Sequence, residues 1–179
     1  MEEISIKSKL VVHRIIFLDI DGVLNTIDTK ERCQGCIGID EEKVKILSKI
    51  INSFEYEPLV VLTSTWKSEW ERVESINDLS VAGQYLVRHL HRWGVHILDK
   101  TDDVYENTRN LRGQSILNWI KNADLDIYSI LVLDDESFDY SECGLEKYHL
   151  KTSFYDNPGG LLESHIEKAL EILNTPSDL

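Results

Sequence analysis

The stretch that decides the fold is residues 11–25, VVHRIIFLDIDGVLN, an apolar run that ends in two aspartates and a glycine. Its first half, Val11 to Leu18, predicts a buried strand. Because side chains alternate between the two faces of a strand, Asp19 and Asp21 are expected to leave it on the same side. Two carboxylates held this close repel each other unless they share a cation or a proton. An acidic turn after a strand is the simpler interpretation, so the other motifs have to decide between the two.

The chain downstream of this stretch alternates short apolar runs with helical patterns. Strands are predicted at Leu59 to Leu62, Val95 to Leu98, Ile127 to Leu133 and Tyr148 to Lys151. Helices are predicted after the N-cap Asp40, from Trp66 to Trp93 as two helices broken near Asn77 and Asp78, from about Arg112, and from Leu161 to Leu173. This alternation predicts a three-layer α/β fold with a doubly wound parallel sheet, in a single domain over residues 1–179. Ligands of such sheets bind beyond the carboxyl ends of the strands.

Hydroxyl and basic side chains occupy two positions where a phosphate could bind. Thr63 and Ser64 directly follow the second strand, and hydroxyl and N–H groups between a strand and a helix suit phosphate oxygens. Capping of the next helix by Ser64 or Thr65 is the alternative. Arg112, at the expected start of a helix, could hold a phosphate or the Asp19 carboxylate, although most single arginines lie at the surface.

Acidic residues follow the fourth strand directly. Asp134, Asp135 and Glu136 come after the apolar run Ile130 to Leu133. Three successive acids at this position favour a bound cation, with a solvated turn as the alternative. Each of these motifs is a modest signal alone, but their positions behind successive strands predict one site at one edge of the sheet.

Composition restricts the partners of the chain. The net charge of −13 should repel an extended nucleic acid. A nucleotide or a single nucleic-acid end stays possible, because a bound cation reverses the charge locally. No run approaches the roughly eighteen apolar residues of a membrane span, and the first ten residues, MEEISIKSKL, lack the apolar region of a signal peptide. We therefore expect a cytoplasmic protein without membrane contact.

The cysteines give a weak signal. There are three of them, an odd number, which argues against a disulfide framework. Cys33 and Cys36 form a C-x-x-C pair, but no second pair of ligands at zinc spacing is present. We expect ordinary reduced thiols, with a metal or redox role as the alternative.

The order of the motifs resembles that of the haloacid dehalogenase (HAD) superfamily: Asp19-x-Asp21-Gly22, then Thr63, then Arg112, then Asp134-Asp135. More specifically, the chain is similar to the stand-alone HAD domain of "Swiss army knife" RNA-repair proteins. The similar segments, FLDIDGVLN, VVLTSTWK, RGQSILNWI, ILVLDDES and the late PGGLL, span most of the chain. The first and fourth motifs are specific in combination, and the other two are loose. The resemblance implies a HAD-like Rossmannoid fold.

The resemblance also implies a chemistry: a magnesium-dependent phosphatase that works through an aspartyl-phosphate. Asp19 would be the nucleophile, and Asp21 would protonate the leaving oxygen and then activate the water that hydrolyses the intermediate. Thr63 would bind a phosphoryl oxygen, with Ser64 as the register-shifted alternative.

The same resemblance implies a set of metal ligands. Asp19, the Asp21 carbonyl and Asp134 would hold Mg²⁺, whose preference for oxygen ligands fits carboxylates. Asp135 would be either a ligand through water or an orienting neighbour.

The third motif departs from the family pattern, which usually offers Lys. Arg112 is the best-placed cation of this chain. Lys100 is the fallback, but it lies before the long loop instead of at a helix start.

Cap domains of this superfamily are inserted after the first motif or between the second and third. Thr26 to Ile39 is too short for a folded cap, and Trp66 to Trp93 resembles two helices of the core, so we expect no large cap domain. An open site of this kind would take a phosphorylated small molecule, or the terminal phosphate of a nucleotide or nucleic-acid end. Two other functions stay open, a catalytically inactive HAD-fold binding module and a phosphoacceptor signalling domain. The latter would carry its phosphorylated Asp where the second strand ends here in Thr63.

Overall fold

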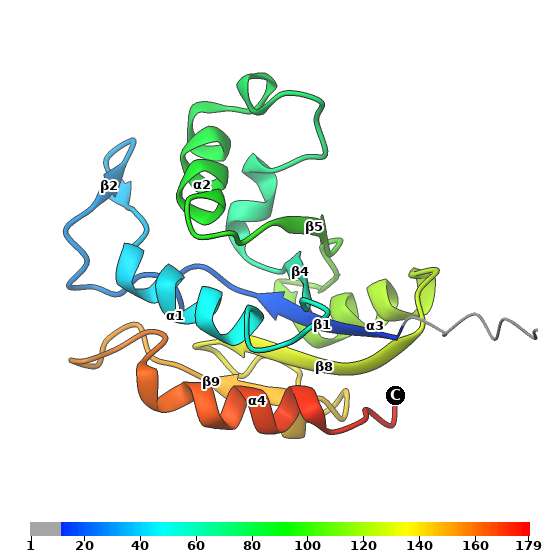
Figure 1. The fold of residues 1–179 in the computed structure, drawn as a ribbon. Coiled ribbons are helices and arrows are strands. Elements are labelled where there is room, and N and C mark those ends of the chain that lie inside the picture. Colours follow the sequence, from blue (N-terminus) through cyan, green and yellow to red (C-terminus); the bar gives the residue numbers. More distant parts are fainter. Residues whose placement is uncertain (1–11) are drawn as a thin grey trace, which may run out of the picture.

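A computed structural model of the protein describes residues 12–179 (Figure 1). Its central sheet has five parallel strands in the order β5-β4-β1-β8-β9. These strands are β1 (His13–Leu18), β4 (Leu59–Leu62), β5 (Ile97–Lys100), β8 (Ile127–Asp134) and β9 (His149–Lys151). The prediction of a parallel sheet is therefore confirmed. Val11 of the first predicted strand, and the ten residues before it on which the expected lack of a signal peptide depends, lie outside the described residues.

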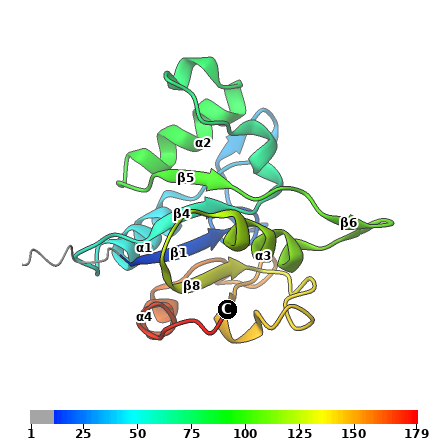
Figure 2. The same cartoon turned by 90° about the vertical axis from the view of Figure 1, so that its right-hand side faces the viewer.

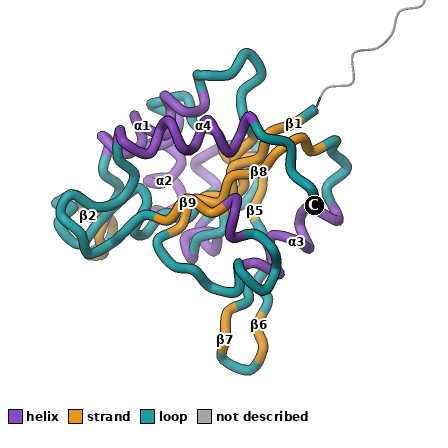
Figure 3. The backbone as a smooth tube through the Cα atoms, turned by 90° about the horizontal axis from the view of Figure 1, so that it is seen from below, coloured by secondary structure: helices purple, strands orange, loops and turns teal. Residues whose placement is uncertain are grey.

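Helices cover both faces of this sheet, as three views of the chain show (Figures 1, 2 and 3). They are α1 (Glu41–Ile51), α2 (Val81–His91), α3 (Arg112–Asn122) and α4 (Ile166–Asn174). On one face α1 packs against both α2 and α4. On the other face α3 brings Trp119 edge-to-face against Phe17 of β1, with 5.5 Å between the ring centroids. The predicted three-layer, doubly wound arrangement is confirmed.

The centre of the core lies where β1 and β8 pair. Residues 15–18 of β1 and 130–133 of β8 are apolar and fully buried. Continuous apolar runs are needed here because helices cover the sheet on both sides. Within residues 12–179, no helix has both the length and the apolar character that crossing a bilayer requires.

The segment between β4 and β5 differs from its prediction. Instead of an α-helix followed by a second one, it forms two short 3-10 helices, η1 (Thr65–Glu69) and η2 (Ile76–Asp78), before α2. The first ends early because the Lys100 ammonium donates to the carbonyl oxygens of Lys67 and Trp70, at 3.0 and 2.6 Å. A side chain from a distant strand thus satisfies the carbonyls at which a longer helix would have continued.

Two other elements begin later than predicted. β5 starts at Ile97 instead of Val95, because the Val95 N–H donates to the Leu90 carbonyl at 3.1 Å and closes the end of α2. Gly94 makes this turn possible with a φ of +74°. The last helix, α4, starts five residues after the predicted Leu161, and a 3-10 turn, η4 (Glu163–His165), precedes it.

Two small hairpins lie in stretches for which the sequence predicted no structure. One consists of β2 (Arg32–Cys33) and β3 (Cys36–Ile37), and the other of β6 (Tyr105–Glu106) and β7 (Arg109–Asn110). The turn of the first is Gln34-Gly35, with φ of 50° and 86°, as tight two-residue hairpins require. The second projects beyond the carboxyl ends of the strands (Figure 2). Within the described residues there is no cap domain, as predicted.

Candidate active site

The carboxyl ends of β1, β4 and β8 lie next to one another and bring Asp19, Thr63 and Asp134 together. Backbone hydrogen bonds continue one residue past the strands. The Asp19 N–H donates to the Leu133 carbonyl and the Thr63 N–H to the Leu18 carbonyl, each at 2.9 Å. The first, second and fourth motifs therefore meet at the edge of the sheet where the sequence predicted a site.

Three carboxylates form the acidic centre of this site. Each of Asp19, Asp134 and Asp135 offers an oxygen within 4.8 Å of the other two. Burial raises the pKa of Asp19 to about 7, against the opposing effect of Arg112, and the charge of Asp134 raises it further. Burial likewise raises the pKa of Asp135 to about 6, and Asp134 again adds to the shift. Three carboxylates held this close, two of them with a raised pKa, fit a divalent ion such as Mg²⁺.

Arg112 is the cation that the protein itself supplies to this centre. Its Nη1 lies 2.6 Å from Oδ2 of Asp134 and 3.3 Å from Oδ2 of Asp19. Burial lowers the pKa of the guanidinium, but the two carboxylates outweigh this and raise it above its ordinary value. The guanidinium also lies 4.2 Å from the centre of the Phe138 ring. Arg112 is thus buried between two acids and is not a surface arginine.

The start of α3 fixes Arg112, because it is the first residue of that helix. The buried Asp139 caps the helix from another part of the chain. Its carboxylate accepts from the Gly113 N–H at 2.6 Å and from the Gln114 N–H at 3.0 Å. An acid at a helix N-terminus is favourable for both hydrogen bonding and the helix dipole. The loop after β8 therefore contributes both Asp135 of the acidic centre and the cap of the helix that carries Arg112.

Lys100, the fallback for the third motif, does not reach the acidic centre. Its ammonium is used at the end of η1, as described above. Lys67 lies nearby, with its Nζ 2.8 Å from a carboxylate oxygen of Asp103 and 3.4 Å from the Thr101 hydroxyl. Of the two residues considered for the third motif, the structure brings only Arg112 to Asp19.

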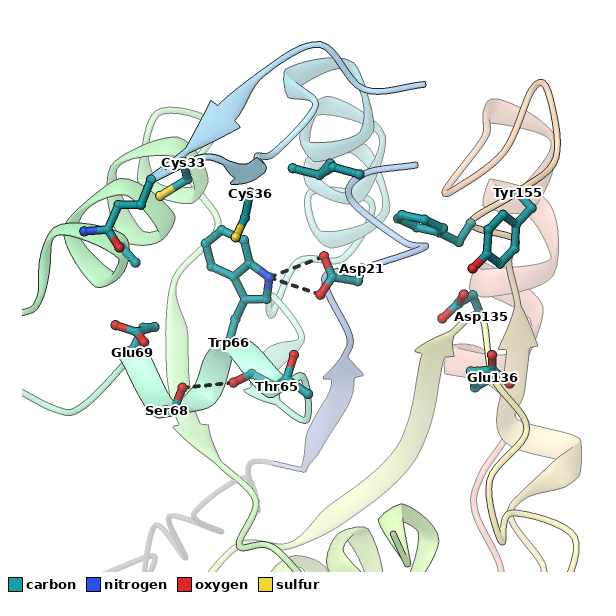
Figure 4. A pocket seen from close by; sticks show the side chains of 14 residues that line it. Asp21, Cys33, Cys36, Thr65, Trp66, Ser68, Glu69, Asp135, Glu136 and Tyr155 are labelled. Atoms are coloured by element: carbon teal, nitrogen blue, oxygen red, sulfur yellow. Dashed lines mark hydrogen bonds between the residues drawn. The ribbon is translucent and has the colours of Figure 1, made fainter. Parts of the chain in front are cut away.

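Asp21 lies to one side of the acidic centre. Its carboxylate accepts from Nε1 of Trp66 at 3.2 Å (Figure 4). It also accepts from Nδ2 of Asn25 at 2.8 Å. The side chain of Asp21 is therefore not part of the cluster that Asp19, Asp134 and Asp135 form. The predicted metal contact of its backbone carbonyl stays a prediction.

Gly22 allows the first and fourth motifs to approach each other. Its φ is +77°, and a Cβ at this position would lie 2.3 Å from Cγ of Asp135. Any other residue would push that acid out of the cluster. The late PGGLL segment supports the same turn, since the Leu161 N–H donates to the Val23 carbonyl at 2.8 Å.

The two hydroxyl residues after β4 have different surroundings. The Ser64 hydroxyl accepts from the Trp66 N–H at 3.3 Å and hydrogen-bonds Asp19, whose pKa it lowers. Oγ1 of Thr63 is buried and, among the residues described, has no hydrogen-bond partner. Leaving a buried hydroxyl unpaired costs about 1–3 kcal/mol. Thr63 therefore has an unused hydroxyl beside Asp19, as a residue that binds a ligand oxygen would have.

Several residues of the site were missed from the sequence. Tyr140 donates from its hydroxyl to Oδ2 of Asp134 at 2.6 Å. Asn25 and Trp66 hold Asp21, and Asp139 caps the arginine helix. Asn25 and Trp66 lie within the similar segments FLDIDGVLN and VVLTSTWK, whereas Asp139 and Tyr140 lie outside every motif, so no local signal marks their role.

Two cavities adjoin the site. The larger, of about 590 Å³, is bounded by Asp21, Trp66 and the β2–β3 hairpin. The smaller, of about 330 Å³, is bounded by Thr63 and Arg112. Asp19 is buried, and Thr65 lines both cavities.

Comparison with known proteins identifies a family. A family model described as "HAD domain in Swiss Army Knife RNA repair proteins" matches residues 15–159, which include every residue of the site discussed above. No curated protein and no solved structure shows significant similarity to the chain.

Proposed function

The chain belongs to the family of HAD domains in Swiss Army Knife RNA repair proteins, and from this premise we propose that it is a magnesium-dependent phosphomonoesterase with Asp19 as its nucleophile. The family suggests a phosphohydrolase-type function. The observation that carries the proposal is the surroundings of Asp19. A buried carboxylate lies beside a buried arginine, two further carboxylates and the unpaired Thr63 hydroxyl.

In the first half of the proposed reaction, an Asp19 oxygen attacks phosphorus and the bond from phosphorus to the leaving oxygen breaks. Asp21 gives its proton to that oxygen, so the leaving group departs as an alcohol. The aspartyl-phosphate remains on Asp19. In the second half, Asp21 takes a proton from water, the oxygen of which attacks phosphorus, and the Asp19 carboxylate is restored with release of inorganic phosphate.

Asp21 is well oriented for these two proton transfers. The Trp66 indole and the Asn25 amide fix its carboxylate, which lines the larger cavity and is not part of the acidic cluster. An acid placed there reaches a leaving oxygen without joining the metal ligands. Trp66 is therefore a positioning residue on this proposal.

Charge on the transferred phosphoryl group requires positive partners. Arg112 and the Thr63 hydroxyl would bind its oxygens, since both border the smaller cavity. Mg²⁺ held by Asp19, the Asp21 carbonyl and Asp134, with Asp135 as a ligand through water or an orienting neighbour, would supply the further positive charge that lets a carboxylate approach a phosphate dianion. The substrate would be a phosphomonoester, either of a small molecule or at the end of a nucleotide or nucleic acid.

Hydrolysis of p-nitrophenyl phosphate with Mg²⁺ tests this proposal. We expect turnover by the protein, loss of turnover in Asp19→Asn, and unchanged turnover in Asp28→Asn, which alters an exposed acid outside the site. A phosphoacceptor domain would instead become phosphorylated about once without continued turnover. A binding module would give neither product nor phosphoprotein, and either result would refute the proposal.

A further inference from the structure

We infer that the leaving group of the substrate carries no negative charge, so the enzyme selects isolated phosphomonoesters and discriminates against substrates with a second anionic group beside the leaving oxygen. This inference rests on the proposed function, because it describes the other half of the same substrate. It concerns the larger cavity, which Asp21 lines and which the smaller, phosphoryl-binding cavity does not include.

The position of Asp21 shows where the leaving group lies. A general acid has to come within hydrogen-bonding distance of the oxygen that it protonates. Asp21 lines the larger cavity, whereas Thr63 and Arg112 line the smaller one. The phosphoryl group therefore lies on the side of Thr63 and Arg112, and the group attached to its leaving oxygen extends into the cavity of about 590 Å³.

The charged side chains that line this larger cavity all have the same sign. Among the described residues they are the four acids Asp21, Glu69, Asp135 and Glu136, and none of the lining residues is Lys, Arg or His. The reaction uses Asp21 and Asp135, so Glu69 and Glu136 are the two charges without a role in it. They lie on opposite sides of the cavity, Glu69 at the end of η1 and Glu136 in the loop after β8 (Figure 4).

The remaining walls of the cavity suit a flat group. Trp66 stands beside Asp21, and Phe154 and Tyr155 come from the loop after β9 (Figure 4). Aromatic faces bind planar rings and cations, and neither contact compensates for a buried negative charge. The smaller cavity is different, since Arg112, Lys67 and Lys100 line it together with two acids. Of these two cavities, only the one on the phosphoryl side has basic residues among its described lining.

This distribution of charge bears on the nature of the substrate. A nucleic-acid strand that presented its terminal phosphate to Asp19 would bring the next phosphate toward Glu69 and Glu136. Like charges a few ångströms apart repel even in water. A nucleoside monophosphate or another single phosphomonoester with a planar, neutral or cationic leaving group avoids this repulsion.

Two substrates of the same shape test the inference: 4-carbamoylphenyl phosphate and 4-carboxyphenyl phosphate. The amide and the carboxylate differ in charge but hardly in size. At low salt we expect kcat/KM to be about tenfold higher for the amide, a difference that corresponds to about 1.4 kcal/mol. The ratio of the two kcat/KM values should become smaller at high salt, because exposed charges are then screened.

Matched variants locate the source of the discrimination. Glu69→Gln with Glu136→Gln should bring the two substrates to within about threefold of each other. Glu55→Gln with Glu57→Gln changes the net charge equally at exposed positions before β4 and should leave the tenfold difference intact. Thermal unfolding of both double variants checks that Glu69, which accepts from the Ser80 hydroxyl, is not needed for folding.

The outcomes separate this inference from the proposed function. Turnover of p-nitrophenyl phosphate with equal kcat/KM for the amide and the carboxylate would overturn the inference and leave the phosphatase standing. An equal loss of discrimination in both double variants would also overturn it, since net charge and not the cavity would then be responsible. Failure to hydrolyse any of the three esters would overturn the proposed function and the inference with it.

Discussion

Replacing Asp19 by Asn should stabilise the metal-free protein while it eliminates turnover. The pKa of Asp19 rises from 3.8 to about 7, chiefly through burial. One pKa unit corresponds to about 1.4 kcal/mol, so ionisation of this carboxyl lowers the folding stability by about 4 kcal/mol. The asparagine has nearly the same volume and cannot ionise, and it therefore avoids this loss.

The sign of the pH dependence follows from which state binds the proton more tightly. The folded protein binds the Asp19 proton more tightly than the unfolded chain does. The stabilisation that this proton provides is therefore complete below pH 3.8 and is lost as the pH rises through about 7. The stability difference between Asp19→Asn and the wild type should therefore grow with pH. About 2 kcal/mol of this growth falls between pH 5.5 and 8.5.

Urea unfolding in EDTA at these two pH values measures the effect. Asp28→Asn, in which an exposed acid is replaced, serves as the control and should show a difference from the wild type that hardly changes with pH. A constant difference for Asp19→Asn as well would refute the argument, because Asp19 would then titrate alike in the folded and unfolded states. Full phosphatase activity in this variant would refute its role as nucleophile.

Three further predictions concern the neighbours of Asp19. Asp21→Asn should lower kcat/KM for an alkyl phosphate by about 10²–10⁴-fold and less for p-nitrophenyl phosphate, whose leaving group needs no proton; equal losses would contradict its role as acid. Tyr140→Phe removes a 2.6 Å hydrogen bond to the buried Asp134 and should cost about 1.5–3 kcal/mol in urea unfolding, whereas a cost below about 0.5 kcal/mol would show that the bond contributes little. At pH 8, Mg²⁺ at 100 times the Kd of the wild type should raise the free energy of unfolding of the wild type by about 2.7 kcal/mol. The same rise in Asp134→Asn at the same Mg²⁺ concentration would argue against that carboxylate as a ligand.

The sheet, and the residues that directly follow its strands in the sequence, were predictable because the patterns that indicate them are local. Apolar runs identified β1, β4 and β8, and the polar residues that follow them directly fell at neighbouring strand ends. Arg112 was placed correctly at the first residue of α3. A parallel sheet covered by helices forces these strand ends to one edge, so the sequence order of the motifs carries spatial information.

Contacts between distant segments account for what the sequence did not predict. The predicted helix after Thr65 ends early, where the Lys100 ammonium donates to the carbonyl oxygens of Lys67 and Trp70. Nothing in the sequence near Thr65 indicates this contact. Tyr140 and Asp139 serve the site through a side-chain hydrogen bond and a helix cap that only the folded loop creates. For Trp66, just past the second motif, the sequence favours core packing, with stacking on a base as the alternative, yet its indole N–H donates to Asp21.

The place of β8 between β1 and β9 has a consequence for synthesis on the ribosome. β1 emerges early, and β4 can pair with one of its edges, but its other edge has no partner until β8 has been made. An apolar strand with an open edge favours aggregation. A nascent chain that stops short of β8 also lacks Asp134. Its sheet is therefore incomplete at the free edge of β1, and so is its set of carboxylates. Prematurely terminated products would thus be substrates for chaperones and proteases, and would not be partly active enzymes.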